Sequence, residues 1–192
     1  MQLELDIARG TPPVPPRVLA SAVLRRHRLK NDVLRSVDYV RRYFPELEGE
    51  TITVGLTRAA SGMAVPGGTR IWLNPSRLTY HTIAHEMIHL LQRRDLGIPG
   101  GEKACDVFSL SRHWTLNDDR PSYIRVPVDL LDDRGRLADA HARLVFSVAR
   151  EAVVRRGHGM RNYISFFECE LARQCEARIS PRRSALRLLH TV

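Results

Sequence analysis

The first third of the chain changes its hydrophobic pattern twice. Residues 11–16 contain four prolines and cannot be helical, because proline fixes φ and lacks an amide donor. We therefore expect residues 1–16 to form an extended arm. From Arg17 apolar residues recur at helical spacing until Pro45, with a break at residues 31–32 that would divide the helix in two.

The middle of the chain alternates between apolar and polar residues, as strands with one buried face do. The alternation covers residues 51–57, and two short apolar segments follow at 62–65 and 70–73. Proline and two glycines at 66–68 are typical of a tight turn. This pattern predicts a small antiparallel sheet.

Helical patterns dominate the remainder. Residues 74–76 supply a cap and a first turn for a helix over about 76–95, and a connector at 99–101 leads to a second helix over about 101–113. Residues 121–127 begin and end with proline and should be extended. Further helices are expected at about 136–156, 160–178 and 181–189.

Together these elements predict an α+β fold. A small antiparallel sheet would pack on the helix at 76–95 and on the helix after it, with additional N- and C-terminal helices. A chain of 192 residues can bury one core, so we expect a single domain over residues 17–192. Its functional unit would span about 51–113 and its helical C-terminal part about 135–192.

Composition changes this picture little. Hydrophobic residues make up 43% of the chain and charged residues 27%, as in an ordinary globular domain. Of the 30 basic residues, against 21 acidic ones, 28 are arginines. Because no run of five like charges occurs, the net charge of +9 does not by itself identify a partner.

Membrane and disulfide signals are both missing from the sequence. No apolar stretch reaches the roughly 18 residues of a membrane helix, and the first ten residues lack a signal-peptide pattern. Cys105, Cys169 and Cys175 form no CxxC pair, which argues against a disulfide framework. We expect a cytoplasmic protein whose cysteines are small buried residues, unless one lies at a functional site.

The most informative motif is HExxH at residues 85–89. Residues four apart share a face of a helix, so His85 and His89 can bind one zinc ion while Glu86 reaches a water on that ion. Apolar neighbours bury this helix and give the dry setting in which zinc is effective. The alternative interpretation is a core helix with partly buried histidines.

A catalytic zinc ion usually has three protein ligands and one open position, so a third ligand is required. Glu102 and Asp106 lie on one face at the start of the next predicted helix. Glu102 would bind the metal, and Asp106 would accept the second N–H of a ligating histidine. The alternative for Glu102 is a first-turn carboxylate favoured by the helix dipole.

Other ligand candidates have weaker support. Asp95 occupies a place used by some zincins, but those have glycine where this chain has Gln92. His113 and His158 have suitable chemistry but no motif. His81 shares the face of the HExxH histidines, and we expect it to support them, since a fourth ligand would fill the open position.

HExxH followed on a later helix by ExxxD resembles the gluzincin metallopeptidases, the thermolysin-like class, and the small size is similar to the compact minigluzincins. The matching residues are His85, Glu86, His89, Glu102 and Asp106. The resemblance covers about residues 51–113, with a connector of only 12 residues between His89 and Glu102. It implies a zinc metalloendopeptidase in which Glu86 takes a proton from the zinc-bound water and passes it to the leaving amine.

The same resemblance places a substrate-binding edge strand at Ile71, Trp72 and Leu73, where an extended peptide would bind through main-chain hydrogen bonds. One more donor would stabilise the oxyanion. Four residues are candidates that the sequence does not rank: His113, Tyr123, His158 and Tyr163.

Two further hypotheses remain open. One is a zinc protease acting on nucleic-acid-bound proteins: residues 102–108 look like a helix of the ImmA/IrrE type, and His158 between two glycines resembles the third-ligand segment of the Spartan/SprT type. No motif supports nucleic acid itself as a partner. The other is a non-catalytic zinc-stabilised interaction module, against which Glu86 argues, because a structural site needs no base.

Overall fold

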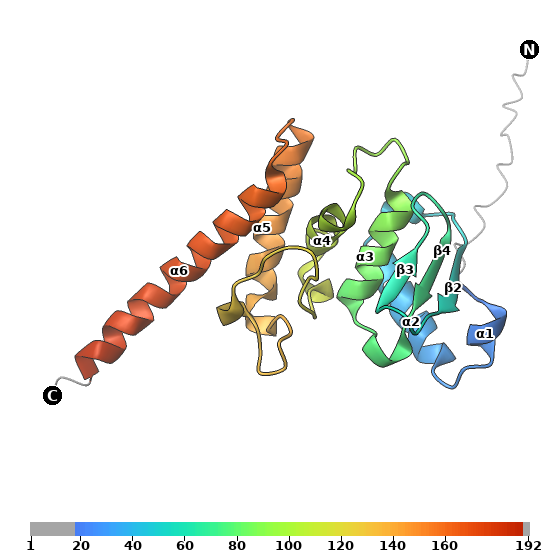
Figure 1. Ribbon diagram of the computed structural model, residues 1–192, viewed down its shortest axis with the longest axis horizontal. Helices are drawn as coiled ribbons and strands as arrows, with labels where there is room; N and C mark the ends of the chain where they lie inside the picture. Colours follow the sequence, from blue (N-terminus) through green and yellow to red (C-terminus); the bar gives the residue numbers. More distant parts are fainter. Residues whose placement is uncertain (1–17, 190–192) are drawn as a thin grey trace, which may run out of the picture.

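The computed structural model describes residues 18–189, and side chains as far as residue 178. The arm expected at residues 1–16 lies outside the described residues. The fold is α+β, as the hydrophobic pattern predicts, with helices on both sides of the HExxH helix and one small sheet (Figure 1).

The sheet is mixed, which corrects the expected antiparallel arrangement. Its strands within the described residues are β1 (Val18–Ala20), β2 (Ile52–Leu56), β3 (Gly62–Ala64) and β4 (Arg70–Leu73). Their order is β1-β2-β4-β3, and only the β3/β4 pair is antiparallel. Helices connect β1 to β2, and such a crossover returns the chain in the same direction. β3 forms a hairpin with β4 on the outside, which leaves β4 parallel to β2.

The N-terminal helix is shorter than predicted. Residues 18–20 form β1, then come α1 (Ala22–Arg25) and α2 (Lys30–Arg41), separated close to the expected break. Three residues are too few to distinguish a period of 2 from one of 3.6, so the pattern misassigned this strand. The side chain of Ser21 accepts a hydrogen bond from the amide of Leu24 and so starts α1.

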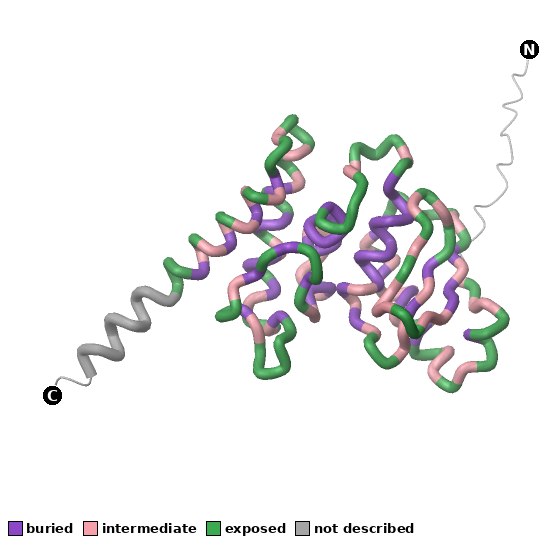
Figure 2. Tube along the Cα trace, viewed as in Figure 1, coloured by how far each residue is buried: buried purple, intermediate pink, exposed green. Residues whose placement is uncertain are grey.

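The HExxH helix is α3 (Tyr80–Leu91), and it lies between the sheet and α4 (Glu102–Leu110) (Figure 1). The Thr79 hydroxyl accepts from the amide of Thr82 and starts α3. Apolar side chains on all faces of α3 are buried, so the helix passes through the middle of the molecule (Figure 2). The sheet therefore packs on one side of the HExxH motif, and α4 packs on the other.

The C-terminal part consists of two long helices packed together, α5 (Asp139–Gly157) and α6 (Tyr163–Leu189). The two helices expected at 160–178 and 181–189 form the single helix α6, because one proline removes one helical hydrogen bond without always ending the helix. The far end of α6 extends away from the body (Figure 1). No helix in residues 18–189 has the length and apolarity that crossing a membrane requires.

Candidate metal centre

Two neighbouring helices supply the residues of the motif. His85, Glu86 and His89 come from the middle of α3, and Glu102 and Asp106 come from the first two turns of α4. The two histidines are each 8% exposed, and Asp106 is 1% exposed. The Glu102 side chain is 45% exposed. The structure thus brings together all five residues that the sequence groups.

The ring of His85 has a defined orientation. Its Nδ1 lies 2.8 Å from Oδ1 of Asp106. Burial alone would raise the pKa of Asp106, but hydrogen bonds from His81 and His85 outweigh it and hold that pKa well below its usual range. An ionised carboxylate only accepts, so the Nδ1–H of His85 donates to it. Burial lowers the pKa of His85, but Asp106 and the nearby glutamates outweigh it and raise that pKa. When the ring loses its second proton, its lone pair is on Nε2.

The ring of His89 is oriented by Gln92. Its Nδ1 lies 2.9 Å from Oε1 of Gln92. The amide nitrogen of Gln92 donates to the backbone carbonyls of Pro99 and Gly101, at 2.8 and 3.2 Å. Carbonyls only accept, so the amide nitrogen of Gln92 must face them and its oxygen must face His89. His89 therefore donates through Nδ1–H, and its lone pair is also on Nε2.

The two lone pairs meet a third acceptor. Oε2 of Glu102 lies 2.9 Å from Nε2 of His85 and 3.2 Å from Nε2 of His89. Either a proton on an Nε2 or a metal ion between the three atoms removes the repulsion between these acceptors. Ligands on a tetrahedral metal with bonds of about 2.0–2.1 Å are about 3.3 Å apart. The 3.2 Å spacing from Glu102 to His89 is close to this value, and the 2.9 Å spacing from Glu102 to His85 is shorter. The residues present therefore fit a bound metal ion.

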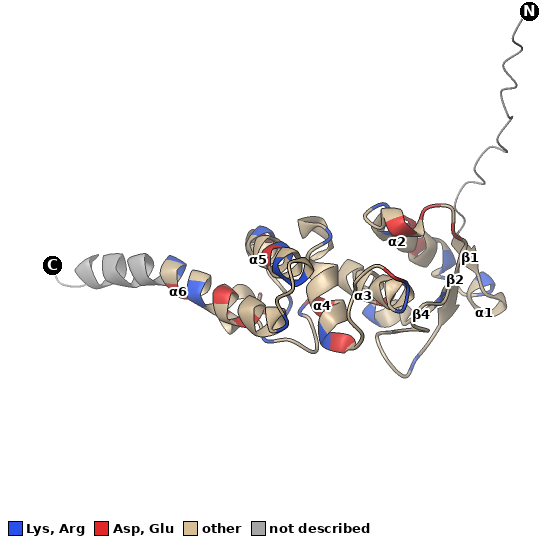
Figure 3. Cartoon of the chain, turned by 90° about the horizontal axis from the view of Figure 1, so that it is seen from above, with Lys and Arg blue, Asp and Glu red and all other residues tan. Residues whose placement is uncertain are grey.

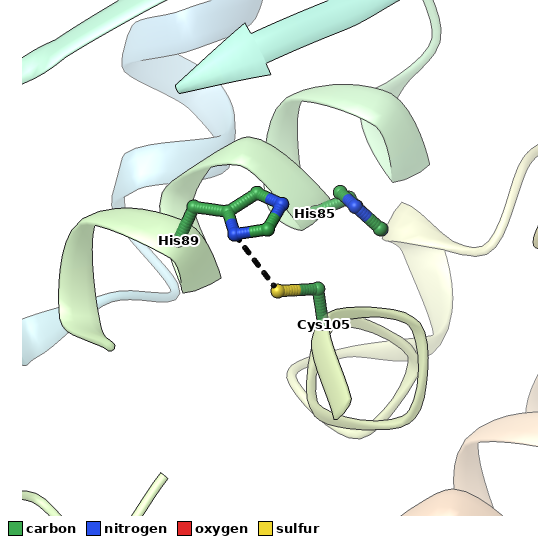
Figure 4. A group of neighbouring side chains, drawn as sticks. All are labelled: His85, His89 and Cys105. Carbon is green, nitrogen blue, oxygen red and sulfur yellow. Dashed lines mark hydrogen bonds between the residues drawn. The ribbon is translucent and has the colours of Figure 1, made fainter. Parts of the chain in front are cut away.

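Cys105 lies beside the same histidines (Figure 4). Its Sγ is 3.3 Å from Nδ1 of His89, on the side of the ring away from Nε2. Burial, together with the nearby carboxylates, raises the pKa of Cys105 far above its usual range, so the thiol is protonated in the metal-free site. Cys175 is buried as expected, whereas Cys169 is exposed, which corrects that expectation.

His81 belongs to a second group with His85 and Asp106. Its Nε2 lies 3.6 Å from Oδ1 of Asp106, and its Nδ1 lies 3.5 Å from the Ser109 hydroxyl. Asp106 already accepts the Nδ1–H of His85 in this group, so the His81 ring is a second polar partner of that carboxylate. This is the supporting position that the sequence predicts for His81.

Glu86 is 5% exposed, and its Oε2 is buried without a hydrogen-bond partner among the described residues. Burial raises the pKa of Glu86 to about 7; the charge of Glu102 adds to this and that of His85 opposes it. Gly62 of β3 packs directly on this carboxylate. A Cβ at position 62 would lie 2.5 Å from Oε1 of Glu86, so only glycine permits this approach.

A cavity of about 520 Å³ opens over these residues. α3 forms its floor, β3 forms one wall, and α4 with residues 119–123 forms the other. Neither Asp95 nor His158 belongs to its described lining, which removes both as rival ligands. His158 instead follows the last turn of α5.

Of the four candidates for stabilising an oxyanion, Tyr123 is the one that lines the cavity among the described side chains. Its backbone N–H donates to Oδ2 of Asp106 at 2.7 Å, and its ring stacks on His85 with centroids 5.8 Å apart. The other three candidates have structural positions: His113 stacks on Tyr43, His158 ends α5, and Tyr163 packs edge-on against Phe108.

The expected substrate strand needs a correction. β4, with Ile71, Trp72 and Leu73, lies inside the sheet between β2 and β3, so its main chain is already paired. The strand beside the cavity is β3, which has no neighbour on its other side in the described part of the chain. The strand assignment failed because strand order depends on pairing that is remote in sequence.

The register shows which peptide groups of β3 are free. The amide of Asn74 donates to the carbonyl of Ser61 at 2.9 Å, and Met63 lies opposite Trp72. Hydrogen-bonded pairs alternate along an antiparallel ladder, so the intervening Gly62 and Ala64 direct their N–H and C=O groups away from β4. These groups face the side on which the cavity lies.

Sequence reasoning missed two residues that shape the site. Gln92 was noted only as a departure from a glycine pattern, although it orients His89. Gly62 had a recognisable signal, since a glycine within a strand pattern often marks a close approach. Comparisons of the chain with protein-family models, curated proteins and solved structures found no match, so the case for its function rests on this geometry.

Proposed function

We propose that the protein is a zinc-dependent metallopeptidase. One observation carries the proposal: two histidine lone pairs of fixed tautomer and one carboxylate oxygen converge beside Glu86, whose own carboxylate has no partner. A structural metal site would not require a buried, unpartnered carboxylate at its side. The resemblance to the gluzincins supports the same function.

His85, His89 and Glu102 would hold the zinc ion. Two neutral imidazoles and one carboxylate form a donor set of the catalytic type, and the adjoining cavity leaves space for a further group. When bound there, zinc polarises a scissile carbonyl and lowers the pKa of water. Asp106 and Gln92 keep both rings in the tautomer that this binding requires.

Glu86 would move the proton. A buried carboxylate beside the three proposed metal ligands can take a proton from the attacking water and release it to the leaving amine. Its unpartnered Oε2 is free for the first of these transfers. Gly62 brings the main chain of β3 close to the same carboxylate.

The β3 edge and Tyr123 would position the peptide. An extended substrate can pair with Gly62 and Ala64 through main-chain hydrogen bonds, which places its carbonyl near the floor of the cavity. Burial and the nearby carboxylates raise the pKa of Tyr123, so its hydroxyl stays protonated. It can then donate to the oxygen that gains charge as the carbonyl is attacked.

The test replaces Glu86 by Gln. We expect zinc content and fold to be unchanged and peptide cleavage to fall by at least about 100-fold, since the general base is lost. Glu151→Gln, on the surface of α5, is the matched control and should cleave at the wild-type rate. Cleavage by Glu86→Gln at the wild-type rate would refute the assignment of Glu86.

A second experiment tests the whole class. A wild-type protein that binds one zinc ion and cleaves no peptide from a diverse library would refute the peptidase and favour the non-catalytic module. Cleavage that appears only when the substrate protein is bound to nucleic acid would instead favour the ImmA/IrrE-like or Spartan/SprT-like alternative.

A further inference from the structure

Gln92 contacts two parts of the site at once. It is 2% exposed and follows the last residue of α3, so its side chain turns back beneath His89. One end of its amide accepts from His89, and the other end donates to Pro99 and Gly101. A buried side chain with all these hydrogen bonds satisfied has one well-defined position.

The second end of the amide lies at the start of α4. Gly101 precedes Glu102 and has a φ of 96°, a conformation that favours glycine. Its carbonyl accepts from the amide of Cys105 as well as from Gln92. The position of Gly101 decides where Glu102 begins, so Gln92 acts on the third ligand as well as on His89.

We propose that Gln92 is a positioning residue that joins His89 to the connector at 93–101 and thereby sets the geometry of Glu102. The hydrogen bonds of Gln92 would then both order the connector and raise the affinity of the site for the metal. The inference rests on the proposed metal site, but not on peptide cleavage, and it concerns a residue outside the HExxH and ExxxD motifs.

Cys105 is the other group that contacts Nδ1 of His89. Its thiol lies on α4 and makes no hydrogen bond to the carbonyls of Pro99 or Gly101 within the described residues. Cys105 can therefore influence His89 but cannot join it to the connector. Simple packing by Gln92 is the remaining alternative, and a methionine of similar shape would preserve it.

The first experiment uses Gln92→Met in the full chain. We expect zinc affinity, measured by competition with a chromophoric chelator, to fall about 10- to 100-fold. Amide hydrogen exchange over residues 93–101 of the metal-free protein should become faster. Gln174→Met on α6 is the matched control and should change neither quantity. Zinc affinity within twofold of wild type would overturn the proposal.

Gln92→Glu distinguishes the effect of the amide oxygen, which accepts from His89, from that of the amide nitrogen, which donates to the connector. The carboxylate still accepts from His89 but donates nothing to the connector, so exchange over 93–101 should be as fast as in Gln92→Met while zinc affinity falls less. Wild-type exchange in the connector of Gln92→Glu would overturn the coupling.

A measurement on the unmodified protein covers the case in which neither variant folds. Nitrogen NMR of the metal-free protein at alkaline pH should show His89 as the Nδ1–H tautomer. The Nε2–H tautomer would contradict the role of Gln92. None of these readouts depends on catalysis, so a protein that binds zinc and cleaves nothing would refute the peptidase and leave this inference standing.

Discussion

At the scale of single residues, groups that can only accept hydrogen bonds determine the tautomers of the two histidines in the site. Asp106 and the carbonyls beside Gln92 can only accept, and this alone assigns a tautomer to each histidine. Glu86 is the opposite case, because its buried oxygen lacks a partner in the described structure. Groups left unsatisfied in a buried setting are where reacting atoms and ions are expected.

Replacing Gly62 by Ala tests the packing on Glu86. The added Cβ would overlap Oε1 and Cγ of Glu86, so the carboxylate must move. We expect a loss of peptidase activity of about 100-fold with zinc content unchanged, because a displacement of about 1 Å can have that effect. Gly157→Ala, where a Cβ meets nothing within 4 Å, is the control. Full activity in Gly62→Ala would show that the contact has no catalytic consequence.

At the scale of elements, the position of β3 at the edge of the sheet matters most. Because β4 is paired on both sides, a substrate strand can be added only beside β3. The exposed side chain of Met63 and the inward approach of Gly62 follow from the alternation along this short strand.

Substrate backbone chemistry tests this edge. We expect N-methylation of a peptide at alternate amides to lower kcat/KM by about tenfold or more, since each methyl group removes a donor that would face β3. Methylation of the intervening amides should have little effect on kcat/KM. Equal effects at successive positions would mean that the peptide does not bind as a strand.

Prediction from sequence was accurate for elements with long patterns and for motifs within a helix. α3 and α4 lie within their predicted ranges, although Pro75–Arg77 form a separate short 3-10 turn and α3 begins only after Thr79. The HExxH residues share one helix face, and so do the ExxxD residues, because each spacing is local to one helix. The sequence pattern did not predict β1, because a strand of three residues is too short to show a periodicity. Strand order and the role of Gln92 depend on how the chain reverses, which no local pattern encodes.

At the scale of the whole molecule, several arginines make contacts between elements of the structure. Arg143 lies over Trp114 at 3.9 Å, and Arg155 lies over Phe166 at 4.2 Å. Arg94 pairs with Glu50 and contacts the hairpin of the sheet. Figure 3 shows basic and acidic residues interspersed over the helices. These three arginines therefore join elements together, as stacked and paired arginines do.

The pH dependence of stability follows from Glu86. The folded protein raises the pKa of Glu86 from 4.5 to about 7, so the folded state binds this proton more tightly than the unfolded chain does. Stability from this group is therefore complete below about pH 4.5 and is lost as the pH rises through about 7, by roughly 3 kcal/mol.

The prediction concerns the metal-free protein. Glu86→Gln should be roughly 3 kcal/mol more stable than wild type above about pH 8 and should differ little near pH 4. Asp106, with its lowered pKa, is present in both proteins and cancels from the comparison. Denaturant unfolding at the two pH values measures the difference. A stability difference that is the same at both would contradict the assigned shift.

The three proposed metal ligands are unequally buried, and this has a consequence for the rate of metal exchange. Both histidines are almost enclosed, whereas nearly half of the Glu102 side chain contacts solvent. An ion arriving from solution would meet the more exposed carboxylate before either imidazole, and a departing ion would leave it last. Replacing Glu102 should therefore change the rate at which the site binds a metal ion as well as its affinity for that ion.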